Sequence, residues 1–208
     1  MRAAVFSEFG GPEVVHLEEL ETPEPGNGEV RLAVKAAAMN HLDLWVRRGL
    51  PVEITMPHNG GSDIAGVVDA VGPGVVGVEL GTRVVVDPSL SYSWYDGAPS
   101  GQRLSAPEFR IIGEHTQGCF AEYCVVPAEN LVEVPEGVGL ETAAAASLVS
   151  VTAWRGLRDR GRLRAGDRVR VTGASGGVST VAIQIARLAG AQVFAVTSGQ
   201  ENIERIRE

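Results

Sequence analysis

The stretch RVRVTGASGGVSTVAIQIARLAGAQVFAVT, residues 168–197, decides the fold class. It begins with a valine-rich run (Arg168–Thr172), passes through a cluster of small residues (Gly173–Gly177) and continues as an apolar segment with helical spacing (Val178–Ala189). A second valine-rich run follows at Gln192–Thr197. The order strand, helix, strand predicts a parallel sheet and therefore an α/β fold.

The cluster of small residues is a candidate anion site. It lies between a strand and the start of a helix, where backbone N–H groups without intrahelical acceptors favour a phosphate. Against the dinucleotide pattern G-x-G-x-x-G, Ala174, Gly176 and Ser179 take the three glycine places. The residues that we predict to bind a dinucleotide here are Gly173, Ala174, Ser175, Gly176, Gly177 and Val178. The alternative is a plain turn between a strand and a helix.

The end of the second strand favours NADPH over NADH. NADH sites usually place an acidic residue about 20 residues after the turn, on the ribose hydroxyls. No Asp or Glu occurs from Leu188 to Gln200, where Thr197 and Ser198 supply hydroxyls instead. A carboxylate would repel a 2′-phosphate by roughly 4 kcal/mol per unit charge at 4 Å and an effective dielectric of 20. Arg205 could reach this phosphate, or could equally be a solvated helix charge.

Residues 1–135 follow a different pattern, with short valine-rich stretches separated by Gly and Pro. The expected strands are Arg2–Phe6, Val30–Ala37, Gly66–Val71, Thr82–Val86 and Ala121–Val126. Several short strands at this spacing predict a β-barrel or sandwich. The stretch from Asp87 to Gly118 has no clear period, so it is either a functional loop or a lobe of its own.

Residues 136–208 are expected to form the incomplete start of a second domain. A helix is predicted over Glu141–Arg160, and another begins at Glu201. Two parallel strands and one crossover helix cannot cover both faces of a sheet that in dinucleotide-binding domains usually has about six strands. We therefore expect a whole barrel domain over 1–135 and an apparently truncated dinucleotide-binding domain over 136–208.

Composition excludes several classes of protein. The chain has 208 residues with 18 basic and 26 acidic side chains, a formal charge of −8, which argues against nucleic acid and anionic membranes as partners. The N-terminus lacks the apolar core of a secretory signal, and no apolar run reaches the roughly 20 residues of a membrane helix. Cys119 and Cys124 cannot form a disulfide framework, and we expect small core residues on opposite faces of a strand. A cytoplasmic protein that binds a small-molecule substrate is expected.

Several segments together resemble the medium-chain dehydrogenase/reductase superfamily, in the family's order and over essentially the whole chain. These segments are Asn40–Asp43, Gly61–Val68, Gly81–Val84, Gly118–Tyr123, Thr152–Trp154 and Gly173–Val178. The resemblance implies a GroES-like β-barrel followed by a Rossmann domain, with substrate and nicotinamide meeting between them. The family's chain is longer than this one.

The resemblance also indicates where related enzymes hold zinc. Zinc-dependent members use a Cys, a His and a third Cys or Asp, and the matching positions here are Asn40, Ser62 and Leu148, none of them a usual zinc ligand. The four cysteines that hold a structural zinc in many members are matched by Tyr92, Tyr95, Ala98 and Ala106. We therefore expect zinc of neither kind. The other polar residues nearby are expected to be hydrogen-bonding loop or core residues (His41, His58) and an anchor (Asp63).

Zinc-free members that this chain resembles are quinone oxidoreductases and related NADPH-dependent enone reductases. The resemblance makes Asn40 a candidate donor of a hydrogen bond to a substrate carbonyl. Asp43 could orient the site, although an exposed cap or a salt bridge is as well supported. Thr152 matches a position that contacts the nicotinamide, and its alternative is a hydroxyl bonded to its own helix. Trp45 and Tyr92 are either pocket walls or packing residues.

The leading interpretation is an NADPH-dependent, zinc-independent reductase of quinones or activated carbonyls. One alternative is a zinc-type alcohol dehydrogenase. The other is a truncated, non-catalytic protein whose barrel serves as an interaction module. An exposed sheet edge after Thr197 further predicts a homodimer.

Overall fold

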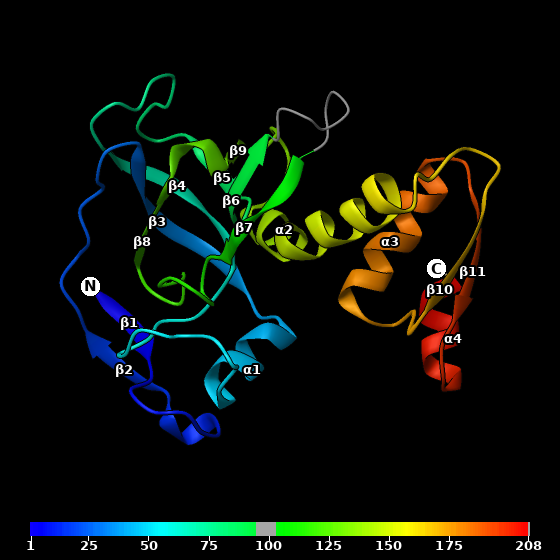
Figure 1. The fold of residues 1–208 in the computed structure, drawn as a ribbon, viewed down its shortest axis with the longest axis horizontal. Coiled ribbons are helices and arrows are strands. Elements are labelled where there is room, and N and C mark those ends of the chain that lie inside the picture. The colour runs from blue at the N-terminus through cyan, green and yellow to red at the C-terminus, as the bar shows by residue number, and fades with distance from the viewer. Residues whose placement is uncertain (95–102, 208) are drawn as a thin grey trace. The chain divides into compact units, whose positions relative to one another are not determined.

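A computed structural model describes residues 1–94 and 103–207 and shows a mixed α/β protein (Figure 1). Contacts divide the chain into two compact units, Met1–Ser147 (unit 1) and Leu148–Glu208 (unit 2). Unit 1 is rich in antiparallel strands, and unit 2 contains the parallel strand–helix–strand arrangement that the stretch 168–197 predicts.

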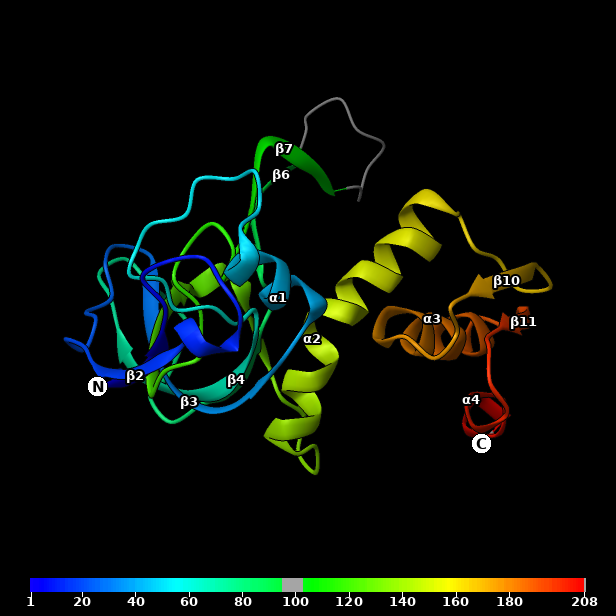
Figure 2. The same cartoon turned by 90° about the horizontal axis from the view of Figure 1, so that it is seen from below.

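A five-stranded antiparallel sheet, in the order β8-β3-β4-β5-β9, forms the centre of unit 1. Its strands are β3 (Glu29–Ala38), β4 (Asp63–Val71), β5 (Arg83–Val86), β8 (Tyr123–Pro127) and β9 (Leu131–Glu133). The pairing of β3 with β4 shifts register at Arg31/Leu32 and again at Val34/Ala36. Such irregularities bend a sheet, and Figure 2 shows β3 and β4 curving together. The short β9 is absent from the strands expected from the sequence.

Two further strand pairs complete unit 1. Strand β1 (Arg2–Val5) pairs with β2 (His16–Glu19), and β6 (Ser89–Trp94) pairs with β7 (Arg103–Ile111), both antiparallel. Short 3-10 turns lie at η1 (Pro12–Val14) and η2 (Ala128–Asn130).

The β6–β7 pair identifies much of the 87–118 stretch as a two-stranded lobe, one of the two options predicted for it. Of the four positions matched to the family's structural-zinc cysteines, Tyr92 lies on β6 and Ala106 on β7. The positions Tyr95 and Ala98 lie outside the described residues.

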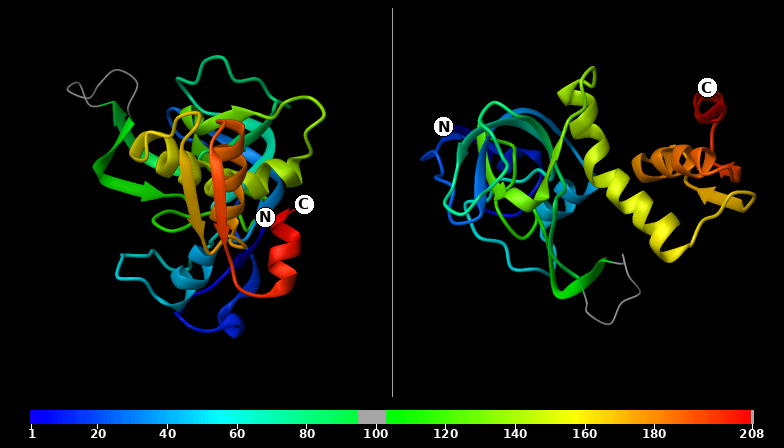
Figure 3. Two further views of the ribbon diagram at one scale, coloured as in Figure 1. Left: turned by 90° about the vertical axis from the view of Figure 1, so that its right-hand side faces the viewer. Right: turned by 90° about the horizontal axis from the view of Figure 1, so that it is seen from above.

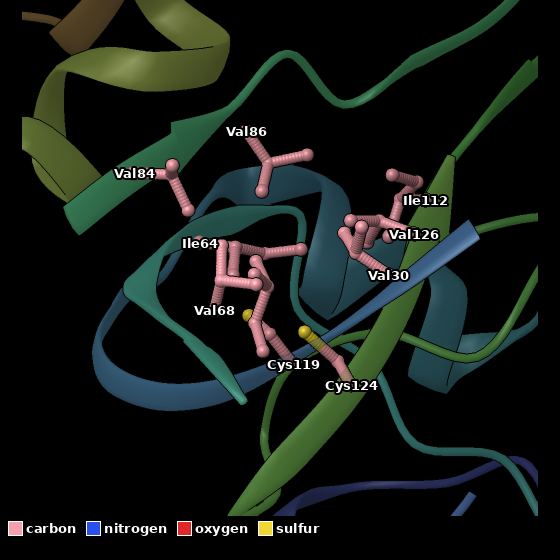
Figure 4. Close-up of a cluster of buried hydrophobic side chains, with 10 residues drawn as sticks. Val30, Ile64, Val68, Val84, Val86, Ile112, Cys119, Cys124 and Val126 are labelled. Atoms are coloured by element: carbon pink, nitrogen blue, oxygen red, sulfur yellow. The ribbon is translucent and has the colours of Figure 1, made fainter. Parts of the chain in front are cut away.

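The core of unit 1 is a cluster of buried aliphatic side chains that contains both cysteines (Figure 4). Cys119 is 1% exposed and Cys124 5%, so the prediction of small core residues is confirmed. Their placement on opposite faces of one strand is wrong, because Cys119 precedes β8 and its thiol turns into the same cluster as that of Cys124. Burial raises the pKa of the Cys119 thiol well above its usual value and that of Cys124 to about 12.

Unit 2 builds on helix α2 (Leu140–Trp154), which includes the boundary between the units, and on a π-helical turn, η3 (Arg155–Arg160). The single helix expected over Glu141–Arg160 therefore changes its hydrogen-bond spacing after Trp154. The π turn ends where the Gly161 N–H donates to the Gly156 carbonyl at 2.8 Å.

The remaining elements of unit 2 are β10 (Arg168–Thr172), α3 (Gly177–Leu188), β11 (Gln192–Val196) and α4 (Gln200–Arg207). Strands β10 and β11 pair in parallel, and α3 lies against them (Figure 3). Among the described residues, no helix combines the length and the apolar character needed to span a bilayer.

Replacing Leu32 by Ala tests the core of unit 1. Leu32 is completely buried, so Leu32→Ala should lower the free energy of unfolding by about 3 kcal/mol. The matched change Leu17→Ala, at a leucine on β2 that is 70% exposed, should alter it by less than about 0.5 kcal/mol. Urea denaturation followed by circular dichroism measures both values, and equal losses would contradict this assignment of the core.

Candidate functional site

The start of helix α1 (His41–Arg48) brings together two residues predicted to be catalytic, Asn40 and Asp43. Asn40 is the N-cap, and its backbone N–H donates to Oδ2 of Asp43 at 2.6 Å. Oδ1 of the same carboxylate accepts the backbone N–H of Gly61 at 3.2 Å. A carboxylate in the first turn of a helix is also favoured by the helix dipole. Asp43 therefore acts as a cap, but as a half-buried one rather than the exposed cap considered for it, and it also joins α1 to the segment before β4.

The Asn40 side chain is oriented by Asp63, the first residue of β4. Nδ2 of Asn40 donates to Oδ2 of Asp63 at 2.9 Å, and Asp63 is 2% exposed. A carboxylate oxygen accepts but does not donate, so this bond fixes which end of the amide faces Asp63. An amide nitrogen carries two N–H groups, so a second donor is left at a defined position. This bond is consistent with the expectation that Asp63 is an anchor.

Burial and a neighbouring acid modify the acidity of Asp43. Burial, with a smaller contribution from the nearby negative charge of Asp63, raises the pKa of the Asp43 carboxyl above its usual value. The backbone N–H groups of Asn40 and Gly61 act in the opposite direction, because they stabilise the carboxylate. The net direction is upward, so the ionised form of Asp43 costs free energy in the folded protein.

Glycines allow two backbone segments to approach each other closely beside this cluster. A Cβ on Gly118 would lie 2.3 Å from the carbonyl oxygens of both Gly60 and Gly61. Gly61 itself has a φ of +98°, in the region that favours glycine. The Phe120 N–H donates to the Gly60 carbonyl at 3.0 Å and holds the two segments together. This close approach positions the backbone on which Asp63 begins β4.

Ser62 lies between Gly61 and Asp63 and is completely buried. Its Oγ has no hydrogen-bond partner among the described residues. Two positions matched to the family's metal ligands are thus Asn40, whose amide is hydrogen-bonded to the Asp63 carboxylate, and Ser62, whose hydroxyl is buried. Neither belongs to the thiolate and imidazole donors that zinc prefers, and the third position, Leu148, is aliphatic.

His58 is a core residue, as predicted. It is 1% exposed, its ring packs against Phe6 with centroids 5.3 Å apart, and Nε2 lies 3.1 Å from the Gly113 carbonyl. Burial lowers the pKa of His58, so the neutral imidazole is favoured. The same prediction is wrong for His41, which is exposed at the first residue of α1, with its ring 6.1 Å from that of Trp45.

In unit 2 the predicted dinucleotide-binding residues form one continuous turn from β10 into α3. The turn is closed where the Gly176 N–H donates to the Gly173 carbonyl at 3.0 Å, and the Ala174 N–H ties it to Val196 of β11 at 3.0 Å. A Cβ on Gly176 would meet only the Gly173 carbonyl, at 3.3 Å, so the space beside the turn is open.

The free N–H groups of this turn lie at the N-terminus of α3. Thr180 carries the first N–H that bonds back to the turn: it donates to the Gly176 carbonyl at 2.9 Å. The N–H groups of Gly177 and Val178, in the first turn of the helix, have no carbonyl four residues earlier within it. These donors and the helix dipole suit an anion.

The other residues predicted to contact a coenzyme have mixed surroundings. The Thr152 hydroxyl donates to the Leu148 carbonyl of its own helix at 2.9 Å, which is the alternative considered for it. Thr197 and Ser198 follow β11, and Ser198 is exposed.

Ser179, at the third glycine place, donates through Oγ to the Thr172 carbonyl at 3.2 Å, so its side chain also fastens α3 to β10. The Arg205 side chain lies outside the described residues.

A cavity of about 310 Å³ lies beside α1 in unit 1 and was not foreseen from the sequence. Its wall is mainly apolar and includes Phe6, Met39, Leu44, Val46, Phe120 and the carboxylate-bearing Asp43. Trp45, a candidate pocket wall, is 53% exposed and lines no part of it. Leu44 and Val46 are two residues apart in α1, a spacing that does not mark one face of a helix, so the sequence gives no sign of this cavity wall.

Titration of His58 should make the stability of unit 1 depend on pH. Its pKa is lowered in the folded state, so below about pH 6.5 the unfolded chain takes up a proton that the native imidazole resists. Stability should therefore fall as the pH drops from 7.5 towards the folded pKa, by at most about 1.4 kcal/mol per pH unit from this group.

The variant His58→Gln keeps an N–H donor near Gly113 but does not titrate, so its unfolding free energy should fall less steeply over the same range. Chemical denaturation of both proteins between pH 5 and 7.5 measures the difference. Parallel curves would contradict the lowered pKa.

Comparison with known proteins places these features in a family. The model of the alcohol dehydrogenase GroES-like domain matches residues 26–136. A zinc-type alcohol dehydrogenase-like protein of Schizosaccharomyces pombe is 37% identical over 98% of this chain and 58% of its own length. A quinone oxidoreductase of Pongo abelii is 31% identical over 99% of this chain and 55% of its own. The crystal structure of an NAD-dependent alcohol dehydrogenase superimposes with a TM-score of 0.92 and 45% identity, over 100% of this chain and 61% of the other.

The chain thus spans a little under three fifths of the length of these two curated relatives. The matched region includes β3 to β9 of unit 1, and the structural match extends through the strand–turn–helix of unit 2. This combination is a GroES-like domain followed by the start of a Rossmann-like domain. The chain therefore belongs to the alcohol dehydrogenase GroES-like domain family, within the medium-chain dehydrogenase/reductase superfamily.

Proposed function

We propose that the protein is an NADPH-dependent oxidoreductase that reduces a quinone or an activated carbonyl compound without zinc. The observation that carries the proposal is the Asn40 amide, held at 2.9 Å by Asp63 where zinc-dependent relatives are expected to carry a cysteine ligand. The quinone oxidoreductase among the relatives and the anion-type turn of unit 2 support the same interpretation.

The residues at the expected metal positions do not fit zinc. An amide already bonded to a carboxylate, a buried hydroxyl and a leucine offer no thiolate or imidazole. Among the described residues, no three His, Cys, Asp or Glu side chains gather in a group able to hold a metal ion. Stoichiometric zinc in the purified protein, measured by elemental analysis, would overturn this part of the proposal and favour a zinc-type alcohol dehydrogenase.

The turn Gly173–Val178 fits a dinucleotide. Open space beside Gly176 lets a pyrophosphate approach the backbone, and the free N–H groups of Gly177 and Val178 can donate to it. The Thr152 hydroxyl donates to Leu148, so its oxygen can still accept a hydrogen bond from a carboxamide. When bound, a reduced nicotinamide supplies a hydride and becomes oxidised, while the conjugated carbonyl substrate gains that hydride and a proton from solvent.

Asn40 is proposed to polarise the substrate. Its second Nδ2–H donates to the carbonyl oxygen and stabilises the negative charge that develops there during reduction. Asp63 keeps the amide in this orientation, and Asp43 fixes the backbone of Asn40 at the start of α1. A donor held before the substrate arrives does not have to be ordered during the reaction, which is the advantage of preorganisation.

The coenzyme is proposed to be NADPH because no carboxylate lies between the end of β11 and Gln200. Thr197 and Ser198 offer hydroxyls to a 2′-phosphate, and neither repels it. We also propose a homodimer, since among the described residues each strand of the β10–β11 pair has one side without a partner strand. A monodisperse monomer by light scattering would contradict that assembly.

Binding of NADPH separates this function from a non-catalytic role. A coenzyme at a hundred times its dissociation constant should stabilise the native state by about 2.7 kcal/mol, seen as an upward shift of the melting temperature. The absence of a shift and of any calorimetric binding signal would favour a protein that serves only as an interaction module.

Replacing Asn40 tests the proposed hydrogen-bond donor. Asn40→Ser keeps a residue suited to the N-cap but removes the amide, so kcat/KM for NADPH-dependent enone reduction should fall about a hundredfold. The Kd for NADPH should stay the same, because the substitution lies outside unit 2. Asn27→Ala, at an exposed asparagine of unit 1, serves as the matched control and should retain full activity. Activity of Asn40→Ser within twofold of wild type would contradict the role of the amide.

A carboxylate placed after β11 tests the coenzyme preference. Ser198→Asp should weaken NADPH binding at least tenfold through repulsion of the 2′-phosphate, and should change NADH binding little. The side chain of Ser198 is exposed. Asn202 binds the backbone carbonyl of Ser198, which the substitution keeps, so folding should be unaffected. Calorimetry of both coenzymes measures the effect, with Ser7→Asp in unit 1 as a control of equal charge. Equal losses of NADPH and NADH affinity would contradict the assignment.

A further inference from the structure

Charge is divided unevenly between the two units. Unit 1 carries 8 basic and 21 acidic side chains, a formal charge of −13, whereas unit 2 carries 10 arginines and 5 acidic residues, a charge of +5. The overall charge of −8 conceals this contrast. Unit 2, which contains the candidate anion-binding turn Gly173–Val178, is itself cationic.

Seven of these arginines lie between residues 155 and 170, immediately before the turn. Leu163 is 5% exposed and anchors the loop that follows the π turn, and Arg162 and Arg164 on either side of it are exposed. Arg160 is exposed as well, at the end of the π turn. The loop is therefore held by an apolar side chain while its cationic side chains extend into water.

The exposed arginines of this segment are not neutralised by acids. In unit 1, Arg2 pairs with Glu122 at 2.8 Å, and Arg31 pairs with both Glu24 and Asp69. In the described part of unit 2, no ion pair joins Arg160, Arg162 or Arg164 to a carboxylate within 4.0 Å. Even Asp167, the nearest acid in sequence after them, accepts the backbone N–H of Arg164 at 2.8 Å.

Two other arginines of the segment bind neutral groups and so keep their charge. Arg158 lies over the ring of Trp154 at 5.6 Å and donates to the Leu163 carbonyl at 2.9 Å. Arg168 lies over the Phe194 ring at 5.2 Å. Cation–π contacts and bonds to carbonyls order a guanidinium without cancelling its field.

We infer that the arginines of unit 2 steer the coenzyme to the turn, an inference that rests on the proposed NADPH function. A surface of one sign raises the local concentration of an oppositely charged ligand and increases its association rate. The effect favours NADPH over NADH kinetically, because the 2′-phosphate adds up to about two negative charges.

Arg160, Arg162 and Arg164 act at a distance rather than by contact. They precede β10 and the turn follows it, so the strand of 5 residues separates them from the turn by about 17 Å. The screening length is about 30 Å at 10 mM salt and about 8 Å at 150 mM, so their field reaches the turn at low salt and is screened at higher salt. Their removal should therefore alter association and leave dissociation unchanged.

Stopped-flow fluorescence of NADPH binding to the full chain tests this inference. The variant Arg160→Gln/Arg164→Gln removes two exposed cations, and the control Lys35→Gln/Arg48→Gln removes two exposed cations of unit 1. Arg162 is left unchanged, because its φ of 50° lies in the left-handed region, where a substitution could also change the strain of the backbone. Both variants take the formal charge from −8 to −10.

For wild type, kon should fall about tenfold between 10 mM and 300 mM salt, with a smaller fall for NADH. At 10 mM salt the unit 2 variant should bind NADPH about threefold more slowly than wild type, with koff and melting temperature unchanged. The control should keep the wild-type kon.

A salt-independent kon, or equal losses in the two variants, would overturn the steering role and leave the proposed function intact. Absence of NADPH binding at every salt concentration would overturn both.

Discussion

The candidate site depends on one carboxylate that accepts two backbone N–H groups from separate parts of the chain. Asp43 binds Asn40 at the start of α1 and Gly61 before β4, and so fixes the distance between the two segments that carry Asn40 and Asp63. Burial raises the pKa of Asp43, so its charge is held at a cost that the two N–H donors reduce only in part. Without this clamp, the Asn40 amide would have no defined position relative to Asp63, and a preorganised donor would become a mobile one.

A close backbone approach supports the clamp from the other side. Gly118 lies where no Cβ could be accommodated, against the carbonyls of Gly60 and Gly61, and the Phe120 N–H binds Gly60. The glycines in this region are therefore requirements of packing as much as of turn geometry. They bring β4 and the segment before β8 together, and this places polar groups from three stretches of sequence around one point.

The strand–turn–helix–strand of unit 2 could be predicted almost to its boundaries, because its periodicity and its glycines are local in sequence. The strands β6 and β7 were not predicted, although the sequence SLSYSW of β6 alternates polar and apolar residues. In β7, RLSAPEFRI, Pro107 and Glu108 interrupt that alternation. The contacts of the site could not be predicted from a local pattern either. The Asn40–Asp63 bond joins residues 23 positions apart, and no local pattern indicates it. The positive charge of unit 2 can be counted from the sequence, but the negative net charge of the whole chain hides it.

The two buried thiols have a consequence for chemical durability. Quinones and enones are electrophiles that add to thiolates, and the chain has two cysteines, both inside the aliphatic cluster of unit 1. Because their pKa values are raised, to about 12 for Cys124, almost none of either thiol is deprotonated near neutral pH. In a reductase of the proposed class, these two thiols would thus resist alkylation by the compounds that the enzyme consumes.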